Sequence, residues 1–182
     1  SKLNSAIKGT DENLANYRIP EAAKVLDEFV DDMSNWYVRR SRDRFWAKGM
    51  EQDKINAYMT LYTALVEICK AAAPMIPFMT EEIYQNLVRS INTEAPESIH
   101  LCDFPAVNEA WIDKELEKNM DEVLKIVVMG RACRNSANIK NRQPIGNMYV
   151  KAPNVLPEYF VEIIEDELNV KKVNFTEAVS YT

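Results

Sequence analysis

The chain has 182 residues, 47% of them hydrophobic, which is enough for one substantial domain or for one domain with a small appendage. It has no run of about 18 apolar residues, and this argues against a helix that spans a membrane. Its formal net charge of −6 argues against a protein whose whole surface coats nucleic acid.

Apolar spacing in the first third of the chain predicts two helices. The first, over residues 1–17, is expected to be interrupted or kinked near Gly9, since glycine is a poor helix former. The second begins at Pro20, because proline fits the first turn of a helix. Apolar side chains then recur every three or four residues and predict one buried stripe. The stripe consists of Ala22, Leu26, Phe29, Val30, Met33, Trp36 and Tyr37.

Two more helices are expected in the middle of the chain. The third runs over residues 52–73 and stops at the PMIP segment, residues 74–77, because proline removes a backbone donor and clashes inside a helix. Thr80 is the expected N-cap of the fourth helix, which reaches residues 88–91. The side chains expected on the buried side of the third helix are Ile55, Met59, Tyr62, Leu65, Val66, Cys69 and Ala73.

The last part of the chain changes its pattern. Residues 98–105 (SIHLCDFP) are expected to be extended, and a long fifth helix over residues 113–139 is expected to end at NRQPIG. In this helix the side chains expected to face inward are Leu116, Met120, Val123 and Val127. A strand over residues 148–151, a helix over residues 157–168 and a strand over residues 170–175 then follow.

The predicted fold class is mainly α. An antiparallel helix bundle is expected over residues 1–143, and a small strand–helix–strand (α/β) region over residues 144–182, as the start of a longer C-terminal region. The three cysteines, Cys69, Cys102 and Cys133, are far apart, odd in number and without a CxxC pair. Reduced, buried thiols in a cytoplasmic protein therefore fit better than a zinc site or a disulfide framework.

No motif in the sequence carries catalytic chemistry. It has no glycine-rich phosphate loop, no GxSxG elbow, no paired catalytic carboxylates and no cluster of metal ligands. We therefore expect no catalytic residue, no metal ligand and no cofactor in this chain taken alone.

The segment NWYVRRSRDRFW, residues 35–46, is locally basic on an acidic chain, since residues 35–48 carry five basic side chains and one acidic one. At 100° per residue, Arg40 and Arg44 fall on the apolar stripe beside Tyr37, where a lone buried charge is costly. Either the helix leaves the bundle here, or it bends, or these two arginines find carboxylate partners.

Three other side chains of the same segment are expected to face outward. Arg39, Arg42 and Trp46 lie at positions i, i+3 and i+7 of the helix. Two guanidinium groups and an indole on one exposed face can hold phosphates and stack on unpaired bases. The alternative is an exposed helix end at which arginines lie near the negative end of the dipole and Trp46 packs sideways.

A second basic segment, residues 125–151, carries six basic side chains and no acidic one. The apolar stripe of the fifth helix runs into Arg131 and Arg134 there, and the helix ends at KNRQP. Basic residues at a helix C-terminus interact favourably with the helix dipole. The alternative is that this end contacts RNA or another domain of a larger protein.

The order of four motifs resembles a known family. NWYVRRSRDRFW, TLYTALVEICKAAAPMIPFMTEEIYQNL, SIHLCDFP and RACRNSANIKNRQPI are similar, over about residues 13–175, to the region that follows the catalytic domain of isoleucyl-tRNA synthetases. That region is the anticodon-binding helical domain of class I synthetases, here in the branch of isoleucine enzymes closest to the eukaryotic type. PFMTEEIY is shared with valyl and leucyl relatives, whereas NWYVRRSRDRFW together with KNRQP favours isoleucine.

The resemblance implies that the chain is a fragment of a tRNA ligase that joins isoleucine to its tRNA with ATP and magnesium. The catalytic and editing domains are expected elsewhere in the same chain, so the fragment alone should be inactive. Its expected partners are the anticodon stem and loop of tRNA and the catalytic domain, in the cytoplasm, with neither a membrane nor DNA as a partner. The alternatives are the same domain of a valyl or leucyl enzyme, or a helical protein-interaction module in which residues 36–46 form a partner's hot spot.

The resemblance also guides the choice of contact residues. It implies a basic residue near the anticodon at the position of Arg42, which agrees with the outward face expected from helical spacing. For Lys140, Arg142 and Gln143 the alternative to an RNA contact is packing against another domain. The expected tRNA-binding residues are Trp36, Arg39, Arg40, Arg42, Arg44, Trp46, Lys140, Arg142 and Gln143.

Overall fold

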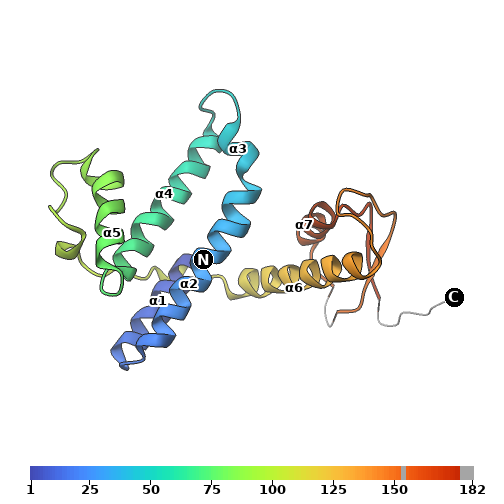
Figure 1. The fold of residues 1–182 in the computed structure, drawn as a ribbon, viewed down its shortest axis with the longest axis horizontal. Coiled ribbons are helices and arrows are strands. Elements are labelled where there is room, and N and C mark those ends of the chain that lie inside the picture. Colours follow the sequence, from blue (N-terminus) through green and yellow to red (C-terminus); the bar gives the residue numbers. More distant parts are fainter. Residues whose placement is uncertain (153–154, 177–182) are drawn as a thin grey trace. The chain divides into compact units, whose positions relative to one another are not determined.

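The structure, a computed structural model, describes residues 1–152 and 155–176 (Figure 1). It is mainly α-helical, which confirms the expected fold class. The chain divides into two compact units, Ser1–Ile112 and Asp113–Thr182. The division expected after residue 143 falls inside the second unit, because the long helix before it packs against the helix after it.

The first two helices, α1 (Lys2–Ala15) and α2 (Ile19–Asp32), pack side by side in the first unit (Figure 1). The expected break near Gly9 was wrong, since α1 is continuous. A Cβ added at Gly9 would lie 3.6 Å from Val25 Cγ1 of α2, an ordinary contact. Packing against α2 stabilises a helix turn in which glycine costs only about 1 kcal/mol.

The predicted second helix does not continue regularly into the basic segment. After α2 the chain forms a π-helical stretch, η1 (Met33–Val38), and then a turn at Ser41, followed by the short helix α3 (Arg42–Trp46). The hydrogen bonds of a π-helix close over five residues instead of four, so each turn holds more residues than an α-helix. The angular position of every side chain after Met33 therefore differs from the one expected at 100° per residue.

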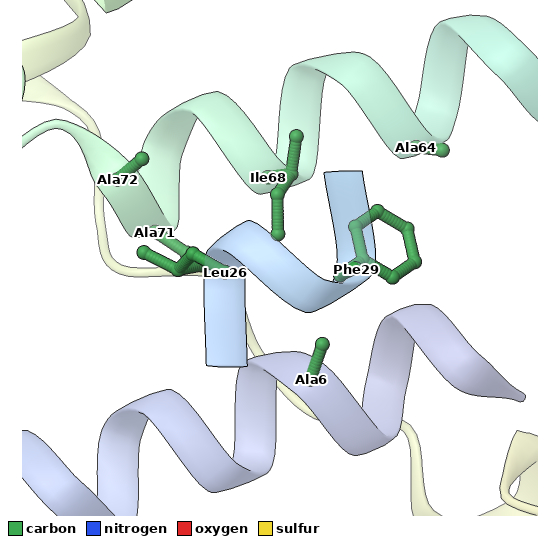
Figure 2. Packing of buried hydrophobic residues seen from close by; sticks show 7 residues of the cluster. All are labelled: Ala6, Leu26, Phe29, Ala64, Ile68, Ala71 and Ala72. Atoms are coloured by element: carbon green, nitrogen blue, oxygen red, sulfur yellow. The ribbon is translucent and has the colours of Figure 1, made fainter. Parts of the chain in front are cut away.

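The helix expected over residues 52–73 is α4 (Gln52–Ala72), which presents small side chains to the core (Figure 2). Alanines let α1 and α2 approach closely, so the buried face of α4 differs from the expected one. Met59 is 55% exposed and Ile55, Tyr62, Leu65 and Val66 are only half-buried, whereas Cys69 and Ala73 are buried as predicted. On α2, Val30 is 45% exposed, against expectation. The buried cluster consists of Ala6, Leu26, Phe29, Ala64, Ile68, Ala71 and Ala72.

The next helix, α5 (Pro77–Tyr84), begins three residues before the expected N-cap and continues as the π-helical η2 (Gln85–Arg89). Thr80 lies inside α5, buried, and its Oγ1 donates to the carbonyl of Ile76 at 3.0 Å. Proline starts this helix well because the first turn needs no N–H from it. A capping role for Thr80 was therefore wrong.

Residues 98–105 were expected to be extended, but they include a short 3₁₀ turn, η3 (Ile99–Leu101). A second 3₁₀ turn, η4 (Glu109–Trp111), follows. Glu81 of α5 holds the first turn, since its Oε2 accepts from Ser98 Oγ at 2.7 Å and from the Ile99 amide at 3.0 Å. The Ser98 hydroxyl, followed by the Gln85 amide, lowers the pKa of Glu81, because donors to a carboxylate favour its charged form.

The second unit is built on α6 (Lys114–Ser136) and α7 (Glu158–Leu168). The expected strands are confirmed as β1 (Met148–Val150) and β2 (Val173–Phe175), which pair in parallel with Met148 opposite Val173. A parallel pair needs a crossover, and α7 supplies it. On α6, Val123 and Val127 are buried and Met120 is half-buried, but Leu116 is 45% exposed.

The cysteines differ from one another in exposure. Cys69 is buried and Cys102 half-buried, but Cys133 is exposed, so the expectation of three buried thiols was wrong for Cys133. All three are free thiols. In the part of the chain that the structure describes, no helix is both long and apolar enough to cross a membrane.

Candidate nucleic-acid interface

The basic segment of residues 35–46 is fixed to the first half of α4 by aromatic side chains. Tyr37 Oη donates to the carbonyl of Ala57 at 3.0 Å. The Phe45 ring lies 6.4 Å from the Tyr37 ring and 5.0 Å from the Tyr58 ring, measured between centroids. Three neighbouring rings and a partly buried hydrogen bond hold α3 against α4.

An ion pair fastens α3 to the start of α4. Arg44 Nε and Nη2 donate to the two carboxylate oxygens of Asp53 at 2.8 and 2.7 Å, and Nη2 also reaches the Asp53 carbonyl at 3.2 Å. These bonds lower the pKa of Asp53 and raise that of Arg44. Of the alternatives considered for the arginines on the apolar stripe, a carboxylate partner is confirmed for Arg44. Its guanidinium is engaged, so it orients α3.

The helix also bends, which was a second alternative. Because of η1 and the turn at Ser41, Arg40 is exposed rather than placed on the buried stripe, and Ser41 is buried instead. Trp36 and Tyr37 are half-buried.

Two guanidinium groups lie beside indole rings on this surface. Arg39 Cζ is 5.3 Å from the centroid of Trp36, and Arg39 Nε donates to the Asn35 carbonyl at 2.7 Å. Arg42 Cζ is 5.5 Å from the centroid of Trp46, which is 75% exposed. Trp46 is therefore not packed sideways into the bundle. Each pair has the geometry of a cation–π contact.

The second set of predicted residues lies on the loop after α6. Lys140, Arg142 and Gln143 are all exposed. The carbonyls of this 140–143 loop accept from two side chains beneath it. Arg134 Nη2 donates to the carbonyls of Lys140 and Asn141, both at 3.1 Å, and to that of Gln143. Asn169 Nδ2 donates to the carbonyls of Asn141 at 3.3 Å and Arg142 at 3.0 Å.

Sequence reasoning did not find the part that Arg134 and Asn169 play. Arg134 is only 4% exposed, and in the described residues its Nε and Nη1 have no hydrogen-bond partner. Asn169 follows α7 with a left-handed backbone, φ +50°, which asparagine tolerates better than most residues. The signal available in the sequence was an asparagine directly after a helical pattern. Arg131, whose side chain is partly exposed, pairs with Glu167 at 2.6 Å, so both arginines of α6 make contacts within the second unit.

The two sets lie in different compact units, residues 35–46 in the first and residues 140–143 in the second. Each presents exposed cations, and the first adds indole rings. A surface of this kind can bind phosphates through guanidinium and ammonium groups and can stack on unpaired bases.

The chain is similar to proteins of one known family. A family model described as the anticodon-binding domain of tRNA ligase matches residues 1–150. The chain is 54% identical to the isoleucine–tRNA ligase of Clostridium kluyveri over 180 residues, which is 99% of this chain. It is 54% identical to that of Clostridium tetani and 55% identical to that of Clostridium novyi over 175 residues, 96% of the chain. The chain spans 17% of the length of each of these relatives.

Proposed function

We propose that this chain binds the anticodon stem and loop of an isoleucine tRNA. The proposal starts from its family, because the chain belongs to the anticodon-binding domains of tRNA ligases. The similarity to isoleucine–tRNA ligases over nearly all of the chain supports the choice of isoleucine. Binding here orients the tRNA so that its distant acceptor end reaches the catalytic domain, and such positioning lowers the barrier of a reaction.

The observation that carries this proposal is the pair formed by Arg42 and Trp46. An exposed indole next to a guanidinium offers a stacking plane and a phosphate donor within one helical turn. Unpaired RNA bases are read in this way, by stacking on aromatic or guanidinium planes and by hydrogen bonds at their edges. Trp36, which is half-buried, and Arg39 form a second cation–π pair nearby in the same segment.

The remaining predicted residues have different parts in the proposal. Arg40 adds charge to the same surface, while Arg44 keeps α3 in place through Asp53. Lys140, Arg142 and Gln143 form a second contact in the other unit. The phosphates that these cations neutralise make the affinity depend on salt.

The activity of the longer protein belongs to the same proposal. We infer that this protein is cytoplasmic and attaches isoleucine to tRNA with ATP and magnesium, in a catalytic domain of the same chain. Among the residues that the structure describes, no three His, Cys, Asp or Glu side chains are grouped so as to hold a metal ion. The proposed binding step uses the cations and rings of residues 35–46 and the cations of the 140–143 loop.

A competition titration tests the proposal. The 182-residue chain is titrated with a labelled isoleucine tRNA transcript at moderate salt, with unlabelled isoleucine, valine and leucine transcripts as competitors. We expect the unlabelled isoleucine transcript to displace the labelled one at the lowest concentration. Better competition by the valine or leucine transcript would contradict the choice of amino acid. Absence of RNA binding, together with self-association, would favour a protein-interaction module instead.

A further inference from the structure

The turn after α7 lies beside the 140–143 loop. Asn169 begins this turn and donates to two carbonyls of the loop. Two residues later, the backbone N–H of Lys171 donates to the Ile145 carbonyl at 2.9 Å. The parallel pairing of the two strands continues from this point. The 169–172 turn and the 140–143 loop are therefore joined at one edge of the second unit.

Four basic side chains lie on these two joined segments, and the sequence analysis had named only two of them. Lys171 and Lys172 are exposed, like Lys140 and Arg142, and within the described residues none of these four side chains forms an ion pair. Residues 137–157 contain no acidic residue. The four side chains form what we call the junction surface.

At the end of α7, Asp166 is exposed, whereas Glu165 and Glu167 make contacts within the second unit. Glu165 Oε1 accepts from the Val173 amide at 2.8 Å. The Glu167 side chain is 4% exposed and pairs with Arg131. Beneath the loop, Arg134 donates only to carbonyl oxygens, so its charge has no carboxylate partner in the described residues. An uncompensated buried cation raises the positive potential of the surface above it.

We propose that the junction surface is a phosphate-binding site for RNA, in which Lys171 and Lys172 act with Lys140 and Arg142. Asn169 is a positioning residue, because it ties the turn to the loop. The inference rests on the proposed function and extends it with contact residues from a second chain segment. Cations on two joined segments can neutralise several phosphates of one backbone.

The salt dependence of RNA binding measures this directly. The variant Lys171→Ala/Lys172→Ala of the 182-residue chain is titrated with an isoleucine tRNA transcript between about 50 and 200 mM salt. The slope of log K against log salt is negative, and each lost phosphate contact reduces its magnitude by about 0.7–0.9. For two lysines we expect the magnitude to fall by about 1.5. Affinity at low salt should fall as well.

A charge-matched control separates a local contact from a general loss of charge. Lys118→Ala/Lys125→Ala removes two exposed lysines of α6, roughly 24 and 14 Å from Arg134 along the helix axis. This control should change the slope much less. An equal decrease in both variants would overturn the junction surface, because net charge alone would then explain the effect.

Asn169→Gly tests positioning, since glycine keeps the left-handed backbone and removes only the amide donor. We expect weaker binding, and we expect Lys171→Ala/Lys172→Ala to cost less when added to it than when made alone. Strict additivity would contradict a positioning part for Asn169. If the lysine variant binds RNA like the unsubstituted chain while Arg42→Ala binds weakly, the junction surface fails and the proposed function stands. If the unsubstituted chain binds no RNA, the proposed function fails.

Discussion

At the scale of single residues, Arg42 and Arg44 show how neighbouring arginines of one motif separate into different tasks. Arg44 directs its donors to Asp53, whose pKa it lowers, and so fastens α3 to α4. Arg42 keeps a guanidinium beside an exposed indole. Motif matching alone treats the two alike, and only their partners distinguish them.

Under the proposed function, Arg42→Ala in the full-length protein should weaken tRNA charging. A hydrogen bond to a charged group contributes about 1.5–3 kcal/mol, so we expect kcat/KM for tRNA to fall about tenfold or more. The salt dependence of charging should become flatter, because one phosphate contact is lost. ATP-dependent activation of isoleucine should not change, since that reaction does not need the anticodon.

The matched control is Arg18→Ala, an exposed arginine at the start of α2, at the far end of that helix from the basic segment. It removes the same charge from the same unit and should leave charging unchanged. Equal losses of charging and of isoleucine activation in Arg42→Ala would instead indicate a general structural defect.

Tyr84 gives a pH-dependent prediction. Its hydroxyl donates to the Pro96 carbonyl at 3.0 Å, and burial is the main reason why its pKa rises from about 10 to about 12. Unfolding exposes the hydroxyl and restores its ordinary pKa. Its protonated form thus stabilises the fold fully below pH 10, and this stabilisation is lost as the pH rises from about 10 to about 12.

Tyr84→Phe should therefore destabilise the chain at neutral pH by about 1 kcal/mol, the usual value of one hydrogen bond. Above about pH 10 the difference from the unsubstituted chain should shrink, since the phenylalanine side chain does not titrate. Urea denaturation at a series of pH values measures both effects. Tyr17→Phe, which changes a ring that is 90% exposed in the same unit, is the control and should follow the unsubstituted chain. A difference that grows above pH 10 would contradict the assignment.

At the scale of elements, the closeness of α6 and α7 depends on a missing side chain. A Cβ added at Gly130 would lie 2.4 Å from Leu168 Cδ1 and 3.3 Å from Leu168 Cγ. Leu168 is 2% exposed, so it has little room to move. Gly130→Ala should thus destabilise the second unit by about 1–3 kcal/mol, the usual cost of overpacking.

The matched substitution is Gly9→Ala in α1. There the added Cβ meets only ordinary contacts with Val25, and alanine is the better helix former. It should stabilise the chain by about 0.5–1 kcal/mol when both variants are compared by urea denaturation. If both substitutions changed the free energy of unfolding in the same direction, the proposed difference in packing between the two glycines would be refuted.

The sequence predicted most elements because long apolar periodicity and proline breaks are local signals. It was wrong about side-chain positions where tertiary packing decides. On α4, close approach of other helices selects the small faces of Ala64 and Ala71, although Met59 and Leu65 are more hydrophobic. Beyond Met33, a π-helical stretch changes the number of residues per turn, and no residue of the motif signals it. The anchoring of the 140–143 loop could not be predicted either, since Asn169 is distant from it in the sequence.

At the scale of the whole molecule, the two basic surfaces belong to a chain whose formal net charge is −6. The acidic remainder repels RNA, so attraction is confined to the cationic surfaces. Residues 35–46 and the junction surface lie in separate compact units and share no residue. Their contributions to the binding free energy should therefore be independent.

A combination of variants measures this independence. Arg42→Ala, Lys140→Ala/Arg142→Ala and the triple variant of the 182-residue chain are titrated with the same isoleucine tRNA transcript over a series of salt concentrations. Substitutions at separate sites usually add within about 0.5 kcal/mol, so the affinity losses should multiply to within about twofold. The salt slopes should likewise decrease in proportion to the cations removed, by about 0.7–0.9 for each. A triple variant no weaker than the weaker of the other two would show that the second surface contributes nothing once the first is lost, and the proposal of two independent contacts would then be abandoned.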